Sequence, residues 1–313
     1  MERSAHLSRR SLLLGTAALA ALPRLGKSQT AAPVRWSAGT APPARKAPPR
    51  ATDCHFHTYD AGYPTAPGAA LTPPDASPDD YKALQRRLGT TRGVLVTPST
   101  YGTDNSLQLA SMTALGADNF RMVAVFAEDV SDSELKRLDS LGARGVRFNL
   151  PFPGPLTMAS LETLSPRLAA LGWHCEINMR PQQLEAAQDL LKRLPSRIVI
   201  DHLGALPADG LNSTSYAIIR RLLDKGNTWV KLSGAYLNSR PPYAESAGIT
   251  AAYVRAAPER MLWGSDWPHP TRKADDKPDD AELFDLMANA MPDQATLQRV
   301  LVDSPAELYG FAP

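Results

Sequence analysis

The sequence has few cysteines, little net charge and no hydrophobic run long enough to span a membrane. Its two cysteines, Cys54 and Cys175, lie in strand-like segments far apart in the chain. Thiols on separate strands seldom meet the spacing that a disulfide needs, so we expect both to be free and buried. The net charge is only +2, and no basic stripe interleaved with aromatic residues is present, so we expect no nucleic-acid partner. Nothing in the sequence indicates a particular oligomeric state.

The N-terminal segment has the features of an export signal. In "SRRSLLLGTAALAAL", Arg9 and Arg10 precede an apolar run from Leu12 to Leu22, which is shorter than the ~20 residues of a membrane span. It resembles a twin-arginine signal, so we expect the twin-arginine export machinery to recognise residues 1–32, with cleavage in or near "SQTAAP". The chain would then fold in the cytoplasm and be exported, in the first instance to the periplasm, without a stable membrane anchor. A signal-anchor or amphipathic helix is the alternative.

The rest of the chain divides into a connector and one domain. Residues 33–50, "PVRWSAGTAPPARKAPPR", are rich in proline, alanine and basic residues and lack an apolar period, which is typical of a linker. From 51 to 313, strand-like runs alternate with helical stretches such as "PDDYKALQRRLG" and "PQQLEAAQDLLKRLP". Eight such units predict an α/β fold, a single-domain (β/α)8 TIM barrel. A doubly wound sheet would need a nucleotide-binding glycine fingerprint, which is not found. The strand candidates are "TDCHFH", "RGVLVTP", "FRMVAVF", "ARGVRFN", "WHCEINM", "RIVIDHLG", "TWVKLSGAY" and "RMLWGSDWPH".

Polar residues follow or end many of these strands, where the chemistry of such barrels takes place. His55 and His57 are two apart on the first strand, so their side chains lie on one face. The other candidates are Arg147 and Asn149 on the fourth strand, Asn178 and Arg180 at the fifth, His202 at the sixth, Ser233, Tyr236 and Arg240 at and after the seventh, and Asp266 and His269 at the eighth.

Three imidazoles and one carboxylate, His55, His57, His202 and Asp266, suit either of two tasks. They are ligands that Zn²⁺ accepts, with a position left open for water. Without a metal, Asp266 could take a proton from water while a histidine stabilises a developing oxyanion. Their spacing does not separate the two, but either arrangement supports hydrolysis.

Three motifs resemble a known family. "DCHFH", "DHLG" and "LWGSDWPHP", supported by "GVRFNL", "KPDD" and "LVDSPAELYGF", are similar to the amidohydrolase superfamily. The resemblance is to the lactonase branch, which includes 2-pyrone-4,6-dicarboxylate lactonase and the sugar-acid lactone hydrolases and isomerases. It extends from residue 51 to the C-terminus. It implies a distorted (β/α)8 barrel that opens cyclic esters, with a small lactone or carboxylic acid as substrate.

Two departures from the family pattern bear on cofactor and substrate. Metal-dependent members supply a further histidine from strand five, where this chain has Asn178, while His174 is at the other end of that strand. We therefore expect no dinuclear centre, and either no required metal or one Zn²⁺ per chain. The pyrone lactonase also has an arginine after the strand-six histidine, where this chain has Ala205. One carboxylate, or a hydroxylated ring, is then easier to accommodate than a planar diacid.

The resulting hypothesis is a hydrolase of cyclic esters in which Asp266 is the general base and the histidines hold the carbonyl oxygen. A substrate hydroxyl in place of water would give isomerisation. A metal-dependent decarboxylase of the same superfamily and an exported, non-catalytic sugar-acid binding module are the alternatives. Arg147 would bind substrate or pair with an acid such as Glu176 or Asp53, and His269 would fix the loop "WPHP". The candidate substrate-binding residues are Arg147, Asn149, Asn178, Arg180, Tyr236 and Arg240.

Overall fold

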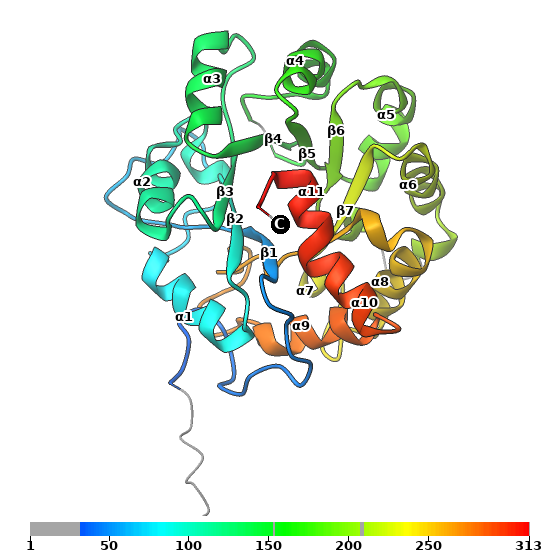
Figure 1. Cartoon of the computed structure of the whole chain (residues 1–313). Helices are drawn as coiled ribbons and strands as arrows, with labels where there is room; N and C mark the ends of the chain where they lie inside the picture. The colour runs from blue at the N-terminus through cyan, green and yellow to red at the C-terminus, as the bar shows by residue number, and fades with distance from the viewer. Residues whose placement is uncertain (1–31, 153, 207–209, 313) are drawn as a thin grey trace, which may run out of the picture. The chain divides into compact units, whose positions relative to one another are not determined.

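A computed structural model describes residues 32–152, 154–206 and 210–312 (Figure 1). Its eight strands form one sheet in the order β1 to β8, and each neighbouring pair is parallel. This confirms the predicted (β/α)8 barrel. The predicted signal peptide lies outside the described residues except for Ala32. The strands are β1 (Thr52–Phe56), β2 (Arg92–Val96), β3 (Phe120–Ala124), β4 (Ala143–Asn149), β5 (His174–Asn178), β6 (Arg197–Ile200), β7 (Thr228–Leu232) and β8 (Met261–Trp263).

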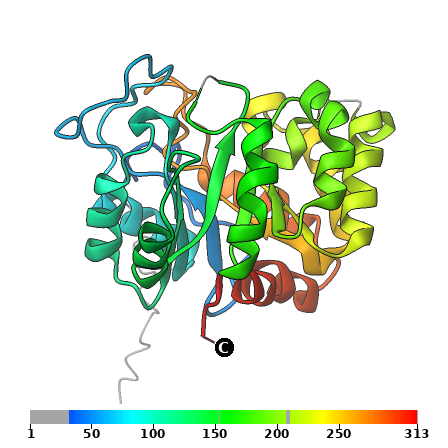
Figure 2. The same ribbon diagram turned by 90° about the horizontal axis from the view of Figure 1, so that it is seen from above.

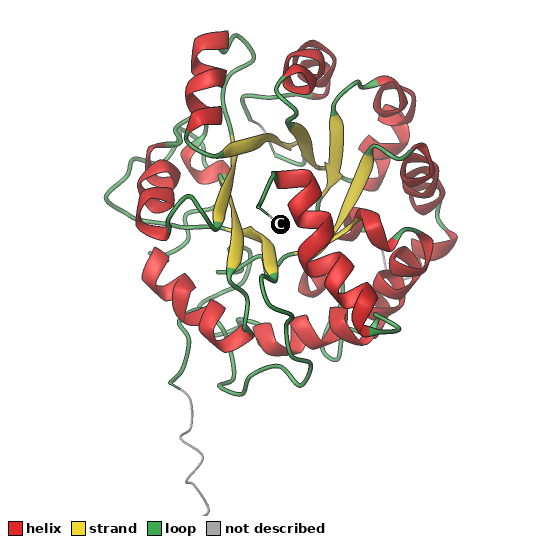
Figure 3. Cartoon of the chain, in the orientation of Figure 1, coloured by secondary structure: helices red, strands yellow, loops and turns green. Residues whose placement is uncertain are grey.

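Helices surround the strands, and local capping sets where they begin and end (Figure 3). The first, Pro78–Leu88, starts at Ser77, whose side chain accepts from the backbone of Asp80, and ends at Gly89 with a left-handed φ of 81°. No helix in the described part of the chain is long and apolar enough to cross a membrane. The helices are α1 (Pro78–Leu88), α2 (Ser106–Leu115), α3 (Asp132–Ser140), α4 (Met158–Ala170), α5 (Pro181–Arg193), α6 (Thr214–Lys225), α7 (Ala235–Asn238), α8 (Ala244–Ala256), α9 (Asp280–Asn289), α10 (Gln294–Gln298) and α11 (Ser304–Tyr309).

The barrel interior is apolar at the amino ends of the strands and carries charged residues towards their carboxyl ends. Val94, Val199 and Leu262 form a buried cluster with Leu308 and Tyr309, so α11 closes that end of the barrel. Figure 2 shows the C-terminal segment at the end away from the strand arrowheads. The opposite, carboxyl end is left for loops and for chemistry. Both cysteines are free and buried, as predicted.

The barrel closes between β8 and β1 through loop residues. β8 is short, and the chain beyond it continues the pairing: the N–H of Asp266 donates to the carbonyl of His55 (2.8 Å), and the N–H of His57 donates to that of Trp267 (2.8 Å). Gly264 is needed between them, because a Cβ there would lie 2.6 Å from the Cβ of His55. Closure therefore places Asp266 directly beside the two histidines of β1.

The segment 33–50, predicted as a linker, lies against the barrel. The side chain of Val34 is buried, and the indole N–H of Trp267 donates to the carbonyl of Arg35 (2.9 Å). Further along, the N–H of Ala44 donates to Asp285 of α9 (2.8 Å). A segment without secondary structure thus contacts the loop that carries Asp266.

Candidate active site

Asp266 is held in a strained conformation at the carboxyl end of the barrel. Its φ is +61°, a left-handed value that is uncommon for a residue with a side chain and is often found at functional sites. The hydroxyl of Tyr236, on α7, donates to Oδ2 (2.6 Å), while Oδ1 lies 3.6 Å from Nε2 of His55 and 3.4 Å from Nε2 of His57. Burial alone would raise the pKa of Asp266, but the nearby imidazoles, that of His202 first, bring it well below its usual value. The carboxylate is therefore ionised at neutral pH.

The two histidines of β1 face each other and are buried. Their Nε2 atoms are 3.2 Å apart. Nδ1 of His57 lies 2.7 Å from the carbonyl of Val96, so it carries the proton and leaves a lone pair on Nε2. Nδ1 of His55 lies 3.0 Å from Nζ of Lys231, so it accepts from the ammonium, and the ring proton is on Nε2. Burial, assisted by Lys231, lowers the pKa of His55 to about 3.

His202 reaches the same point from the other side of the barrel. It begins a short 3₁₀ turn after β6, in which His202, Leu203 and Ala205 all have positive φ. Its Nδ1 lies 3.0 Å from the hydroxyl of Ser233, and its ring centroid is 4.8 Å from that of His55. The left-handed turn redirects the chain so that the imidazole projects across the end of the barrel.

A buried ionic network lies beneath these groups. Nζ of Lys231 is 2.5 Å from Glu176 and 3.6 Å from Asp201, and Nε of Arg147 is 3.4 Å from Asp201. Burial opposes ionisation of both acids, but Lys231 brings the pKa values of Asp201 and Glu176 below the usual range. Lys231 was not predicted as a site residue. A lysine within the apolar run "TWVKL" was the available signal, because a buried ammonium needs acidic partners.

His55, His57 and Asp266 match the spacing of a metal site. Their three ligand atoms are 3.2, 3.4 and 3.6 Å apart. Bond lengths of ~2.0–2.2 Å in a tetrahedral Zn²⁺ site place ligand atoms roughly 3.3–3.6 Å from one another. Binding would require a lone pair on Nε2 of His55, and hence a proton on Nδ1 directed at Asp201 (3.4 Å) instead of a bond from Lys231. The residues therefore fit one zinc ion, provided that His55 changes tautomer.

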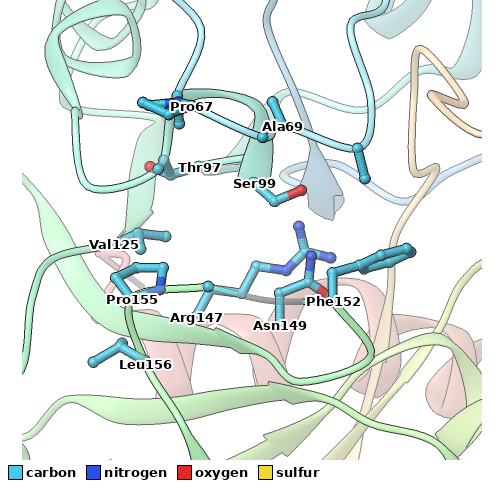
Figure 4. Close-up of a pocket in the computed structure, with 15 residues that line it drawn as sticks. Pro67, Ala69, Thr97, Ser99, Val125, Arg147, Asn149, Phe152, Pro155 and Leu156 are labelled. Atoms are coloured by element: carbon cyan, nitrogen blue, oxygen red, sulfur yellow. The ribbon is translucent and has the colours of Figure 1, made fainter.

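His57, His202 and Asp266 line a cavity of about 200 Å³, whereas His55 is fully buried and does not line it. A second cavity of about 310 Å³ lies beside it (Figure 4). The two share four lining residues, Ser99, Arg147, Asn149 and Phe152. Arg147 and Asn149 are thus placed where the two spaces meet.

Comparison with known proteins agrees with this architecture. The amidohydrolase family model matches residues 52–311. The chain belongs to the amidohydrolase family. It is 35% identical to 4-sulfomuconolactone hydrolase of Rhizobium radiobacter (87% of this chain, 94% of that one) and 33% identical to D-galactarolactone isomerase of Agrobacterium fabrum (90% and 97%). An apo crystal structure from Agrobacterium tumefaciens superposes with a TM-score of 0.81 at 30% identity, covering 89% of this chain and 99% of that one. The predicted family is confirmed.

The amidohydrolase barrel does not bring every predicted residue to the cavity of Asp266. Asn178 does line it, with its amide donating to Asn149 (2.8 Å). Arg180 instead donates to the carbonyl of Pro151. Arg240 lines a separate polar cavity, which Tyr236 also lines. His269 lies 3.1 Å from Asp280, so it ties the loop to α9.

Proposed function

We propose that this amidohydrolase opens or rearranges the ring of a lactone of a small carboxylic or sugar acid. The observation that carries the proposal is the position of Oδ1 of Asp266, beside two imidazoles and on the wall of a cavity that also holds His202 and Arg147. The names of the two relatives, 4-sulfomuconolactone hydrolase and D-galactarolactone isomerase, support a lactone as substrate.

In this mechanism Asp266 is the general base. Its Oδ1 accepts a proton from a water molecule while Tyr236 holds Oδ2, and the water oxygen bonds to the lactone carbonyl carbon. The bond from that carbon to the ring oxygen then breaks, and the ring oxygen takes the proton from Asp266. A substrate hydroxyl in place of water gives a new lactone by the same proton transfers.

His202 stabilises the charge that develops on the carbonyl oxygen. It lines the cavity and presents an N–H at Nε2 when its Nδ1 accepts from Ser233. The buried Nε2–H of His55 points instead at the lone pair on Nε2 of His57 (3.2 Å), so this pair orients the two rings beside Asp266. A zinc ion held by His55, His57 and Asp266 would supply Lewis acidity at the same point.

Arg147 recognises a carboxylate of the substrate in this proposal. It is buried on β4, and its guanidinium lies beside Ser99, Asn149 and Phe152, the other residues that line both cavities (Figure 4). Its Nε lies within ion-pair distance of Asp201 (3.4 Å) and Glu176 (3.9 Å). The remaining guanidinium donors are then available to a carboxylate of the substrate.

A lactone panel tests the proposal. The purified protein is incubated with five- and six-membered lactones in a weakly buffered pH-indicator solution, with and without a chelator, and NMR follows isomerisation, which releases no net proton. An Asp266→Asn protein prepared in parallel corrects for spontaneous opening. We expect at least one lactone to be opened or rearranged well above that background. A panel in which neither readout shows turnover would overturn the proposal, and the chelator arm shows whether a metal is needed.

We also propose export by the twin-arginine route, which rests on "SRRSLLLG" in the sequence. Replacing Arg9 and Arg10 by Lys should trap the precursor in the cytoplasm, as followed by cell fractionation. Unchanged export of that variant would exclude the route.

A further inference from the structure

The cavity beside the catalytic groups is walled by two loops, and hydrogen bonds hold the first of them in place. One is the loop after β1, in which the N–H of Ala66 donates to the carbonyl of Thr100 (2.8 Å) and the hydroxyl of Thr100 donates to that of Leu71 (2.8 Å). The other follows β4 and contributes Phe152 and Leu156. Anchoring of the first loop shows that the cavity is a built feature.

The walls of this cavity are apolar away from its junction with the catalytic space. We call it the apolar lobe, and its apolar lining residues include Ala66, Ala69, Val125, Phe152, Pro155 and Leu156. Among its described lining residues Arg147 is the only one with a charged side chain. Thr97, a polar lining residue, donates its hydroxyl to Asn105 (3.0 Å). Figure 4 shows Arg147 and Asn149 on one side, with Val125, Pro155 and Leu156 on the other and Pro67 and Ala69 facing them.

A hydroxylated or doubly charged ligand fits these walls poorly. Hydroxyl groups or a second carboxylate placed in the lobe would lose hydrogen bonds to water without gaining partners, which costs binding energy. An alkyl or aryl group gains by leaving water, by about fourfold in binding for each methylene. The volume of about 310 Å³ has room for several carbon atoms, since a water molecule takes ~30 Å³ in the liquid.

We propose that the substrate is a lactone with one carboxylate and one apolar substituent. The ring lies in the catalytic space, the carboxylate on Arg147 at the junction, and the substituent in the apolar lobe. The inference rests on the proposed lactone chemistry and narrows its substrate class, away from polyhydroxylated sugar-acid lactones.

The test uses a matched series of substrates. The parent is a five-membered lactone with one carboxylate (paraconic acid), and three derivatives carry ethyl, butyl or hexyl on the ring carbon bonded to the ring oxygen. D-Galactarolactone serves as a polyhydroxylated comparison. For the wild-type protein we expect kcat/KM to rise along the series, by at least tenfold from parent to butyl, and to exceed that for the sugar lactone.

Two variants connect this preference to the lobe. Ala69→Phe fills the lobe from a loop residue, so the ratio of kcat/KM for butyl over parent should fall close to one. Ala61→Phe makes the same change in the same loop at an exposed residue outside the lining of either cavity, and should keep the wild-type ratio. Melting temperatures confirm that both variants are folded.

The inference is supported if kcat/KM rises along the alkyl series and only Ala69→Phe abolishes this rise. Equal turnover of all four lactones, a preference for the sugar lactone, or a ratio unchanged by Ala69→Phe would overturn the inference while leaving lactone chemistry intact. Turnover of no lactone at all would overturn the proposed function, and the inference with it.

Discussion

The hydroxyl of Tyr236 lies 2.6 Å from Oδ2 of Asp266, and both side chains are buried. Burial and the adjacent carboxylate raise the pKa of Tyr236 well above its usual value, so the phenol keeps its proton and donates it. The Oδ2 atom of Asp266 is therefore occupied by the hydrogen bond from Tyr236. The other carboxylate oxygen, Oδ1, is left to face His55, His57 and the cavity.

Replacing Tyr236 by Phe should loosen this orientation without removing the base. We expect kcat to fall by about 10–100-fold, because small displacements of a reacting group are costly, while KM changes little. The buried Oδ2 also loses its partner, so the melting temperature should drop. Tyr243→Phe is a matched control, since this tyrosine is buried nearby in the wall of the separate polar cavity. Equal kcat values for the two variants would show that Tyr236 does not position Asp266.

Removing Lys231 should damage stability more than any other single change in the buried network. Lys231→Met removes one of the cations that Glu176 and Asp201 share and leaves Arg147 beside them, and breaking a buried pair typically costs ~3–5 kcal/mol. Urea unfolding measures the loss. Adding Glu176→Gln removes one of the carboxylates that lost its partner, so the double variant should regain part of the stability. A double variant less stable than the single one would contradict this assignment of charges.

Stability should decline as the pH falls from 7 to 5. Burial lowers the pKa of His55 to about 3 and also lowers the pKa values of His57 and His174. Below pH ~6.5 these histidines therefore bind protons in the unfolded chain but not in the folded one, which lowers the free energy of unfolding. Asp53 has the opposite effect on stability. Burial raises its pKa to about 6, so its stabilising contribution to the folded state is present below pH ~4 and is lost as the pH rises through 6. Three histidines outweigh one aspartate, and a melting temperature that is constant or higher at pH 5 would refute this balance.

The sequence predicted those features that depend on local pattern. Strand runs with helices capped by Ser77 and Gly89 led to the barrel, and the two-residue spacing of His55 and His57 placed them on one face. Other features depend on tertiary contacts. Asp266 pairs with β1 through residues that follow the short strand β8, and this pairing could not be read from the sequence. The composition of residues 33–50 likewise gave no sign that they would pack on the barrel.

The difference between local pattern and tertiary contact also explains which predicted arginines reach the cavity of Asp266. Arg147 lies on a strand, so its inward direction follows from alternation along β4. Arg180 and Arg240 follow their strands in loops, where sequence does not determine direction, and the structure turns them away from the cavity of Asp266. Lys231 was not predicted as a site residue, because its role depends on Glu176 and Asp201, which other strands of the barrel bring to it.

The measurement that bears most directly on Asp266 as the proton acceptor compares kcat and melting temperature for the wild type and Asp266→Asn, on whichever lactone the panel identifies. Asn keeps the shape of the side chain and can still meet Tyr236, but it cannot take the proton from water. We expect kcat to fall by ~10²–10⁴, the usual contribution of a general base, with substrate binding little changed and the protein still folded. A stable Asp266→Asn protein with the full kcat of the wild type would contradict the mechanism.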